Sequence, residues 1–311
     1  MAGYIARRLV QMVPVLFLIS LFVFFLVRLV PGSPADALLG FRATPEAIEK
    51  INQRFSLDKP IYQQYITFIK NLFQGDLGVS ARRNEPVTDI LRQRIPTTLF
   101  LVTYSMLLSI LISVPLASWS ALRRGRPADH AIRVYAMLSL AMPSYWIGMM
   151  LLQGLAVREK LFPVAGYGEG FFGHIESLFL PALSLALASS SLLIRSLRNS
   201  LLETIDSDYV RTARAKGLTG RTVFLWHVMR NSAVTAITIL GVRLSFLVGG
   251  TAIIETVFSV PGIGQLIVKA IFDRDYAVIQ GVTLVFGILV LLINLVVDII
   301  YVALDPRVSF E

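Results

Sequence analysis

The side chains best suited to bind another molecule lie in one polar stretch, "DSDYVRTARAKGLTGRTVFLWHVMRNS", which separates two long apolar segments. The stretch runs from Asp206 to Ser232 and carries five cations, namely Arg211, Arg214, Lys216, Arg221 and Arg230. Aspartate and serine at its start favour a helix beginning near Tyr209, because their oxygens accept hydrogen bonds from N–H groups of the first turn. Gly217 fits the left-handed position that ends a helix, and Thr219 is suited to cap a second one. The pattern therefore predicts a basic helical hairpin.

Residue types for catalysis or cofactor binding are scarce elsewhere. No G-x-x-x-x-G-K-[ST] loop occurs, so the chain is not expected to bind ATP in the P-loop manner. A G-x-G-x-x-G string at Gly168–Gly173 follows no predicted strand and opens no βαβ unit, which argues against a dinucleotide site. The three histidines, His130, His174 and His227, are isolated from one another, and cysteine is absent. We therefore expect no catalytic, cofactor or metal site in this chain.

The elements that position the hairpin are apolar segments. Only 16% of the 311 residues are charged, against roughly 25% in soluble domains, so lipid is the expected solvent. A spanning helix needs about 20 largely apolar residues. The segments that qualify are Leu9–Val30, Thr98–Leu122, Ala131–Leu155, Ser177–Ile194, Val234–Val257 and Val278–Ala303. They predict an all-α polytopic membrane protein with six transmembrane helices, the first of them uncleaved because no A-x-A site follows it.

Cationic residues in the short loops predict the orientation of these spans. The Arg7–Arg8 end and the Arg123–Arg133 and Arg195–Arg230 loops carry an excess of Lys and Arg. Such loops stay beside the anionic inner leaflet, so both termini are expected to be cytoplasmic. The predicted parts are an N-terminal span (1–30), an extracytoplasmic helical segment (31–97), a transmembrane core (98–303) containing the cytoplasmic hairpin loop (195–233), and a cytoplasmic tail (304–311).

The extracytoplasmic segment is expected to form a small helical cap. Thr44 and Pro45 start one helix, and Asp58 with Pro60 opens a second one that ends at Gly75. The apolar stripe of the second helix is Ile61, Tyr65, Ile66, Ile69 and Phe73. A distinct binding domain is the less favoured alternative, because fewer than roughly 70 residues seldom build a core of their own.

Arg243 is the ionisable residue placed nearest the middle of an expected span, about ten residues into Val234–Val257. An unpaired guanidinium at the bilayer centre costs about 2.5–3.5 kcal/mol on insertion scales. Two interpretations remain open. Arg243 makes a buried structural pair or carbonyl contact, or it lines a path for a solute.

The first helix of the hairpin is interpreted as a protein-docking element. It places Tyr209, Ala213 and Lys216 on one face, and the small residues Thr212, Ala213 and Ala215 allow another surface to approach. A lipid anchor would look similar but would carry bulky apolar residues, which this helix lacks. The second helix is expected to rest on the membrane boundary through Phe224, Leu225, Val228 and Met229.

The hairpin resembles the cytoplasmic "EAA…G" loop of ABC importer permeases, in the variant "DYVRTARAKGL" of the dipeptide/oligopeptide/nickel family. Further matches are "RLVPGSP", "GDLGVS", "LPALSLAL", "ETVFSVPGIGQL", "RDYAVIQG" and "DPRV", whose order and spacing cover nearly the whole chain. The sequence departs from the strict signature at two positions. Arg211 replaces its leading glutamate and Thr212 follows, so that Ala213 and Gly217 are the residues retained.

This resemblance implies a type I ABC importer permease-like fold in a bacterial or archaeal cytoplasmic membrane, and transport of peptides or similar small solutes. It implies four kinds of partner: a second related permease, membrane lipid, an extracytoplasmic solute-binding protein, and two cytoplasmic ATPase subunits that use ATP and Mg²⁺. The hairpin would supply a coupling helix at about 208–217, seated in a groove on an ATPase subunit. A larger side chain at Ala213 would hold it out of that groove. The contact residues would be Tyr209, Arg211, Thr212, Ala213, Arg214, Lys216 and Gly217.

Two other classes of function have less support from the residues. An autonomous secondary transporter would need intramembrane carboxylates or broken helices for ion coupling. A membrane-embedded hydrolase would need a convergent nucleophile and base. The solute itself is left open by the sequence, since permeases of this type carry dipeptides, longer peptides, glutathione or nickel chelates.

Overall fold

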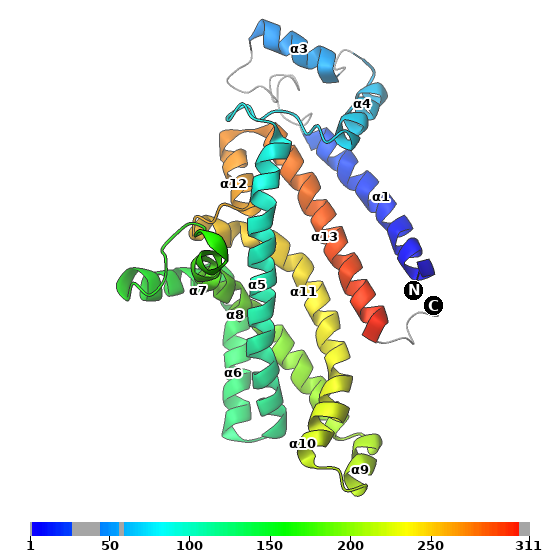
Figure 1. Cartoon of the computed structure of the whole chain (residues 1–311), viewed down its shortest axis with the longest axis vertical. Helices are drawn as coiled ribbons and strands as arrows, with labels where there is room; N and C mark the ends of the chain where they lie inside the picture. Colours follow the sequence, from blue (N-terminus) through cyan, green and yellow to red (C-terminus); the bar gives the residue numbers. More distant parts are fainter. Residues whose placement is uncertain (1, 27–43, 56–58, 305–311) are drawn as a thin grey trace. The chain divides into compact units, whose positions relative to one another are not determined.

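The structure, a computed structural model, describes residues 2–26, 44–55 and 59–304 (Figure 1). Within these ranges, side chains are described except at 2–5, 51–55, 235, 242, 243, 245, 248 and 301–304. The "RLVPGSP" and "DPRV" motifs, residues 305–311 of the predicted tail, Asp58 and the side chain of Arg243 therefore lie outside the described residues.

The described chain is helical, which confirms the expected all-α class. The helices are α1 (Ala2–Leu26), α3 (Pro45–Phe55), α4 (Ile61–Phe73), α5 (Val87–Leu122), α6 (Pro127–Ala141), α7 (Ser144–Leu151), η3 (Leu152–Arg158), α8 (Gly170–Ile205), α9 (Asp208–Ala215), α10 (Gly220–Thr222), η4 (Val223–Met229), α11 (Arg230–Val257), α12 (Ile263–Asp273) and α13 (Tyr276–Leu304). Extended pairing in the described residues is limited to an isolated bridge between Val79 and Pro86.

Helices occupy all six ranges in which membrane spans were expected. Four of them are long and apolar enough to cross a membrane, over Ala6–Leu26, Val87–Leu122, Gly170–Ile205 and Tyr276–Ile300. The bent pair that follows α5 raises the number among the described residues to five. The total of six spans stays a prediction, and α11 fills the fifth expected range.

The third expected span is broken rather than straight. α6 and the α7–η3 helix meet at an angle of 103°. Met142 has an extended conformation and Pro143 follows it. Because a proline lacks the N–H of a helical ladder and disfavours the helical conformation of the residue before it, α6 ends there and a new helix begins at Ser144.

The described residues form two compact units. The first comprises Leu101–Phe258 and the chain from Ile293 onward. In this unit α8 packs against α6, α7 and α11. α5 contributes buried small residues at four-residue intervals, Ser105, Ser109, Ser113, Ala117 and Ala121. The Ser189 hydroxyl of α8 donates to Ser109 Oγ at 3.4 Å, so this stripe lies against α8. Small side chains permit such close approach of two helices.

The second unit comprises Ala2–Phe100 and Ser259–Leu292. Its core joins the start of α5 to α12 and to the first turns of α13. Asp275 is buried and accepts hydrogen bonds from the Ser80 hydroxyl and the Val278 N–H, which connects the "GDLGVS" and "RDYAVIQG" motifs. A Cβ at Gly281 would lie 2.6 Å from Val87 Cγ1, so α13 approaches α5 closely at this glycine.

Candidate functional site

The basic hairpin forms where predicted, between the end of α8 and the start of α11. Ser207 is the residue before α9, and its hydroxyl donates to the Thr204 carbonyl at 2.6 Å instead of capping the helix. Thr204 Oγ1 in turn lies 3.1 Å from Ser232 Oγ, and both residues are buried. The two ends of the hairpin are therefore joined by one hydrogen bond between side chains.

Gly217 ends α9 in the left-handed conformation, at φ +82°, which confirms the prediction from its residue type. The Gly217 N–H donates to the Arg214 carbonyl at 2.9 Å, and the Leu218 N–H donates to the Ala213 carbonyl at 3.4 Å. This pair of bonds is the Schellman arrangement, which uses carbonyls that a helix end otherwise leaves unpaired. The chain can then reverse and enter the second helix.

Thr219 caps the second helix as predicted, because its Oγ1 accepts a hydrogen bond from the Thr222 N–H at 3.4 Å. The helix then passes through one π-helical segment, η4, and continues into α11 without a break. This continuity was not predicted. It places the second helix of the hairpin and the expected fifth span on one helical rod.

α9 uses two apolar side chains three residues apart to attach to the first unit. Val210 is 0% exposed and Ala213 is 6% exposed. Both belong to a core cluster with Val223 and Val228 of η4 and Leu197 of α8. The expectation that the Ala213 side chain lies on the docking face is therefore wrong. The burial of Val228 also corrects its expected position at the membrane boundary.

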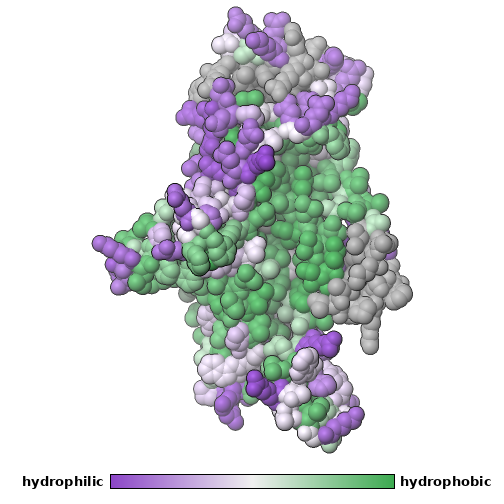
Figure 2. All heavy atoms as spheres, viewed as in Figure 1, coloured by the Kyte–Doolittle hydropathy of each residue, from purple (hydrophilic) through white to green (hydrophobic). Residues whose placement is uncertain are grey.

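The opposite side of α9 is exposed and polar. Tyr209 is 46% exposed, and Thr212, Arg214 and Lys216 are exposed as well. Arg211 is also exposed and makes only a loose 3.5 Å contact with Asp208. The Tyr209 hydroxyl donates to the His227 carbonyl at 3.4 Å, which holds α9 against η4. The face available to another molecule therefore combines small residues with four polar or cationic ones, and Figure 2 shows mostly hydrophilic and neutral atoms around α9.

A buried ion pair connects three helices that share this core. The Arg198 Nε and Nη2 atoms donate to the two carboxylate oxygens of Asp129, each at 2.8 Å. The Ser120 hydroxyl donates to Asp129 Oδ1 at 2.6 Å, and the Gly125 N–H donates to Oδ2 at 2.9 Å. Residues of the same α5, α6 and α8 segments, Ala121, Ile132 and Leu197, lie in the cluster that receives α9. The ion pair therefore fixes the helices on which the hairpin rests.

Asp129 lies in the Arg123–Arg133 connection, before the expected third span. The guanidinium of Arg198 holds the pKa of its carboxyl well below the usual range, and the Ser120 and Gly125 donors act in the same direction against the opposing effect of burial. The side chains are 13% exposed for Arg198 and 2% for Asp129. Sequence reasoning missed this pair because the two residues are 69 positions apart and no local pattern links them.

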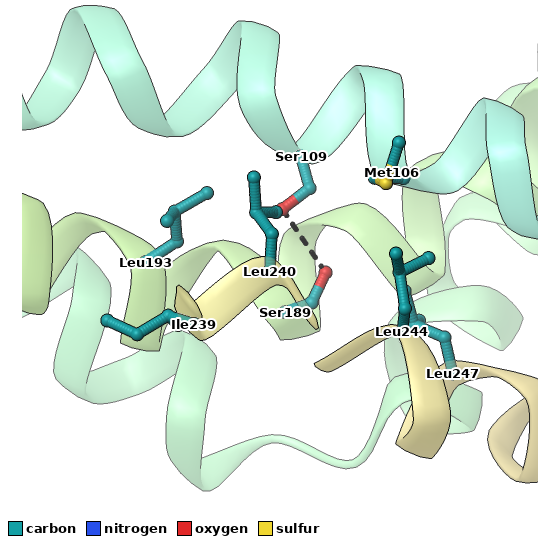
Figure 3. A pocket seen from close by; sticks show the side chains of 8 residues that line it. All are labelled: Met106, Ser109, Ser189, Leu193, Ile239, Leu240, Leu244 and Leu247. Atoms are coloured by element: carbon teal, nitrogen blue, oxygen red, sulfur yellow. Dashed lines mark hydrogen bonds between the residues drawn. The ribbon is translucent and has the colours of Figure 1, made fainter. Parts of the chain in front are cut away.

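A small cavity adjoins α11 in the first unit (Figure 3). Its volume of about 10 Å³ has room for at most one water molecule. Its lining residues are Met106, Ser109, Ser189, Leu193, Ile239, Leu240, Leu244 and Leu247. This cavity is therefore too small to hold a solute. The prediction for Arg243, which lies in α11 between Leu240 and Leu244, is not tested because its side chain is outside the described residues.

Comparison with protein families gives two matches that together span almost the whole chain. The description "Binding-protein-dependent transport system inner membrane component" matches residues 113–310. A second description, for the N-terminal part of a binding-protein-dependent transport system membrane component, matches residues 1–102. The first match contains the hairpin, the ion pair and α11.

Curated relatives match along their entire length. The chain is 35% identical over 316 residues to the oligopeptide transport system permease protein AppB of Bacillus subtilis (strain 168), with 100% of both chains covered. It is 36% identical over 314 residues to a putative peptide transport system permease protein of Brucella abortus (strain 2308), again over 100% of both. It is 35% identical over 311 residues to the glutathione transport system permease protein GsiC of Escherichia coli (strain K12), with the same coverage.

A solved structure supports the fold. A chain from inward-facing conformations of the MetNI methionine ABC transporter superposes with a TM-score of 0.59 at 19% identity. The match covers 70% of this chain and 96% of that chain. At this identity the likeness shows the fold and not the solute.

Proposed function

Because the chain belongs to the family of binding-protein-dependent transport system inner membrane components, we propose that it translocates peptides or similar small solutes in an ATP-driven importer. The chain is a bacterial multi-pass membrane permease of the peptide and oligopeptide group, and it is not itself an enzyme. Its curated relatives are named for oligopeptides, peptides and glutathione, which supports a peptide or peptide-like solute.

The observation that carries the proposal is the two-sided structure of α9. One side is fixed in this chain's own core by Val210 and Ala213. The other side leaves Tyr209, Thr212 and Lys216 exposed. A helix built only to complete the membrane core has no need of an exposed cationic face, whereas a helix that receives force from a partner needs both a fixed side and a free side.

The proposed partner on the free side is a cytoplasmic ATPase subunit, with α9 as the coupling helix. ATP and Mg²⁺ would be bound by that subunit, since this sequence contains no phosphate loop. Arg211, Arg214 and Lys216 offer three cations to an acidic groove, with Thr212 and Gly217 allowing close approach. Such charges mainly increase the rate and specificity of association.

Movement of α9 would reach the membrane core through two connections. The first is the core cluster that Val210 and Ala213 share with Leu197 of α8. The second is the uninterrupted helix from η4 into α11. Closure of the ATPase subunits would bias the spans toward one of two states, and hydrolysis would restore the other. The remaining proposed partners are a second permease, which completes the solute path, and an extracytoplasmic solute-binding protein.

Arg243 is proposed as a residue of the solute path, and the cytoplasmic position of both termini is proposed from the distribution of Lys and Arg. The break between α6 and α7 gives no support to an autonomous ion-coupled transporter, because no Asp, Glu, Lys, Arg or His lies between Ala141 and Trp146. Ion coupling at a broken helix uses the exposed helix ends together with ion-binding groups.

Co-purification of the ATPase tests the proposal most simply. Thr212→Arg adds a long side chain to the free face of α9 without entering the core. We expect the variant to insert and remain folded while it retains much less ATPase and loses peptide uptake. Arg221→Lys is the matched control, because Arg221 is exposed on α10 outside the proposed contact. Full ATPase retention and uptake by the Thr212→Arg transporter would exclude docking through this face.

A further inference from the structure

α4 is an amphipathic helix whose apolar side is divided between two neighbours. At about 100° per residue, its polar residues fall on one continuous side. These residues are Gln63, Gln64, Thr67, Lys70 and Asn71. The remaining arc is apolar, and it consists of a half around Tyr65 and Phe68 and a half around Tyr62, Ile66 and Phe73.

The first half packs on α1 within the second unit. The Tyr65 ring meets Phe17 and Phe24 edge-on, with ring centroids 6.1 and 5.2 Å apart. Phe68 lies 5.7 Å from Phe24 between centroids. The Ser20 hydroxyl donates to the Phe17 carbonyl at 2.8 Å and lies 2.7 Å from the Tyr65 hydroxyl. Since Ser20 has a single hydroxyl proton, Tyr65 is the donor in the second bond, and the buried serine is satisfied.

The second half is largely exposed in the part of the chain that the structure describes. Tyr62 is 61% exposed, Ile66 is 50% exposed and Phe73 is 87% exposed. These three side chains lie within about 40° of one another around the helix axis, at 3.6 residues per turn. They form one apolar stripe along the whole length of α4. Exposing such a stripe to water costs free energy.

The adjoining surface of α1 identifies what covers this stripe. Ala6–Leu26 is a membrane-span candidate, and Leu18 and Phe22 of this span are each 61% exposed. The contacts with α4 extend from Phe17 to Phe24, which is about 10 Å of helix in the C-terminal half of Ala6–Leu26. An interfacial helix sinks its apolar face about 5–10 Å into the boundary between headgroups and acyl chains. The exposed stripe of α4 therefore continues the exposed apolar surface of α1.

We propose that α4 is an interfacial membrane helix, which inserts Tyr62, Ile66 and Phe73 into the leaflet at the C-terminal end of α1. Lys70 and the glutamines face water and headgroups on its opposite side. The occupant of the stripe is phospholipid. The Tyr65 contact with Ser20 holds the helix at a fixed depth on the first span. This anchor would hold even if α9 did not bind an ATPase.

Site-directed spin labelling of the full-length chain in phosphatidylethanolamine–phosphatidylglycerol nanodiscs tests the proposal. The chain has no native cysteine, so single cysteines are introduced by Ile66→Cys or Phe73→Cys. Gln63→Cys and Lys70→Cys are controls on the polar side of the same helix. Leu18→Cys supplies a lipid reference and Glu85→Cys a water reference. Collision of each label with oxygen, which concentrates in lipid, is compared with collision with a water-soluble nickel chelate.

We expect the oxygen-to-nickel collision ratio at Ile66 and Phe73 to be several-fold higher than at Gln63 and Lys70, and close to that at Leu18. A ratio at Ile66 and Phe73 equal to that at Lys70 would place the stripe in water and overturn the proposal. Exclusion of both reagents from Ile66 and Phe73 would show that a protein surface covers the stripe, which would overturn it equally.

Discussion

The conformation of the hairpin depends strongly on Gly217, because the backbone there is left-handed. No atom lies within 4 Å of the position a Cβ would take, so a substitution meets only the penalty of the left-handed backbone at φ +82°. Gly217→Val should cost about 1–2 kcal/mol in ending α9 there. We expect membrane insertion to survive while ATP-driven uptake falls several-fold, measured in proteoliposomes that contain the assembled transporter.

The matched substitution at this position is Gly217→Asn, because asparagine tolerates the left-handed region better than other non-glycine residues. It should retain most of the uptake. Equal loss in the Val and Asn variants would mean that the absence of a side chain, and not the backbone conformation, is what Gly217 contributes.

The Asp129–Arg198 pair is expected to matter for stability far more than its exposed counterpart. Asp129→Asn leaves the Arg198 guanidinium, 13% exposed, without its carboxylate. Breaking a buried pair in this way costs about 3–5 kcal/mol. The control is Asp206→Asn, since the Arg124–Asp206 side chains are 64% and 65% exposed and such surface pairs contribute about 0–1 kcal/mol. Thermal unfolding of the purified variants checks this. Similar decreases in unfolding temperature for the two variants would show that burial does not set how much each ion pair stabilises the protein.

The sequence predicts a residue's role where the backbone conformation requires a particular residue type. It does not predict which way a side chain faces where packing decides this. Gly217 and Thr219 could be assigned their positions because left-handed ends and N-caps have strong residue preferences. The burial of Ala213 was missed, although Val210 and Ala213, three residues apart, mark the apolar side of a short helix. An alanine is compatible with either face, so its side was decided by contacts with Val223 and Val228 of a different element.

At the scale of elements, hydropathy predicted where helices lie but not how they are joined. The six expected ranges all contain helix, because long apolar runs leave few alternatives in lipid. The break at Pro143 could have been inferred from the proline itself. The continuous passage from η4 into α11 could not have been inferred. Nothing in the "GRTVFLWHVMRN" segment indicates whether it forms a separate helix or continues into the next one.

α11 also carries the proposed contact with solute. Arg243→Ala should reduce uptake at least several-fold while the transporter still assembles, because a guanidinium in a water-filled path binds solute carboxylates without supporting packing. Quantifying subunits that co-purify beside uptake separates the two effects. Loss of assembly in proportion to uptake would favour the structural pair that remained an alternative for this residue. Arg230→Ala, exposed at the start of the same helix, is the control.

At the scale of the whole molecule, the orientation of the chain is open to chemical labelling because cysteine is absent. Glu85 is exposed in the segment expected to be extracytoplasmic, and Arg126 is exposed in the loop between α5 and α6. A membrane-impermeant maleimide added to intact cells should label Glu85→Cys and spare Arg126→Cys until the cells are opened. Ser80 is unsuited to this purpose, since it is 1% exposed. The opposite labelling pattern would show that the chain has the inverted orientation in the membrane.

The exposed side of α9 is proposed to contact an ATPase subunit. A photoreactive amino acid placed at Thr212 or Lys216 of the assembled transporter tests it directly, with Leu225 as the control because it is 47% exposed on η4 and expected at the membrane boundary. We expect adducts between this chain and the ATPase from Thr212 and Lys216, and lipid or no adducts from Leu225. Absence of ATPase adducts from both α9 positions in a transporter that retains its ATPase would contradict it.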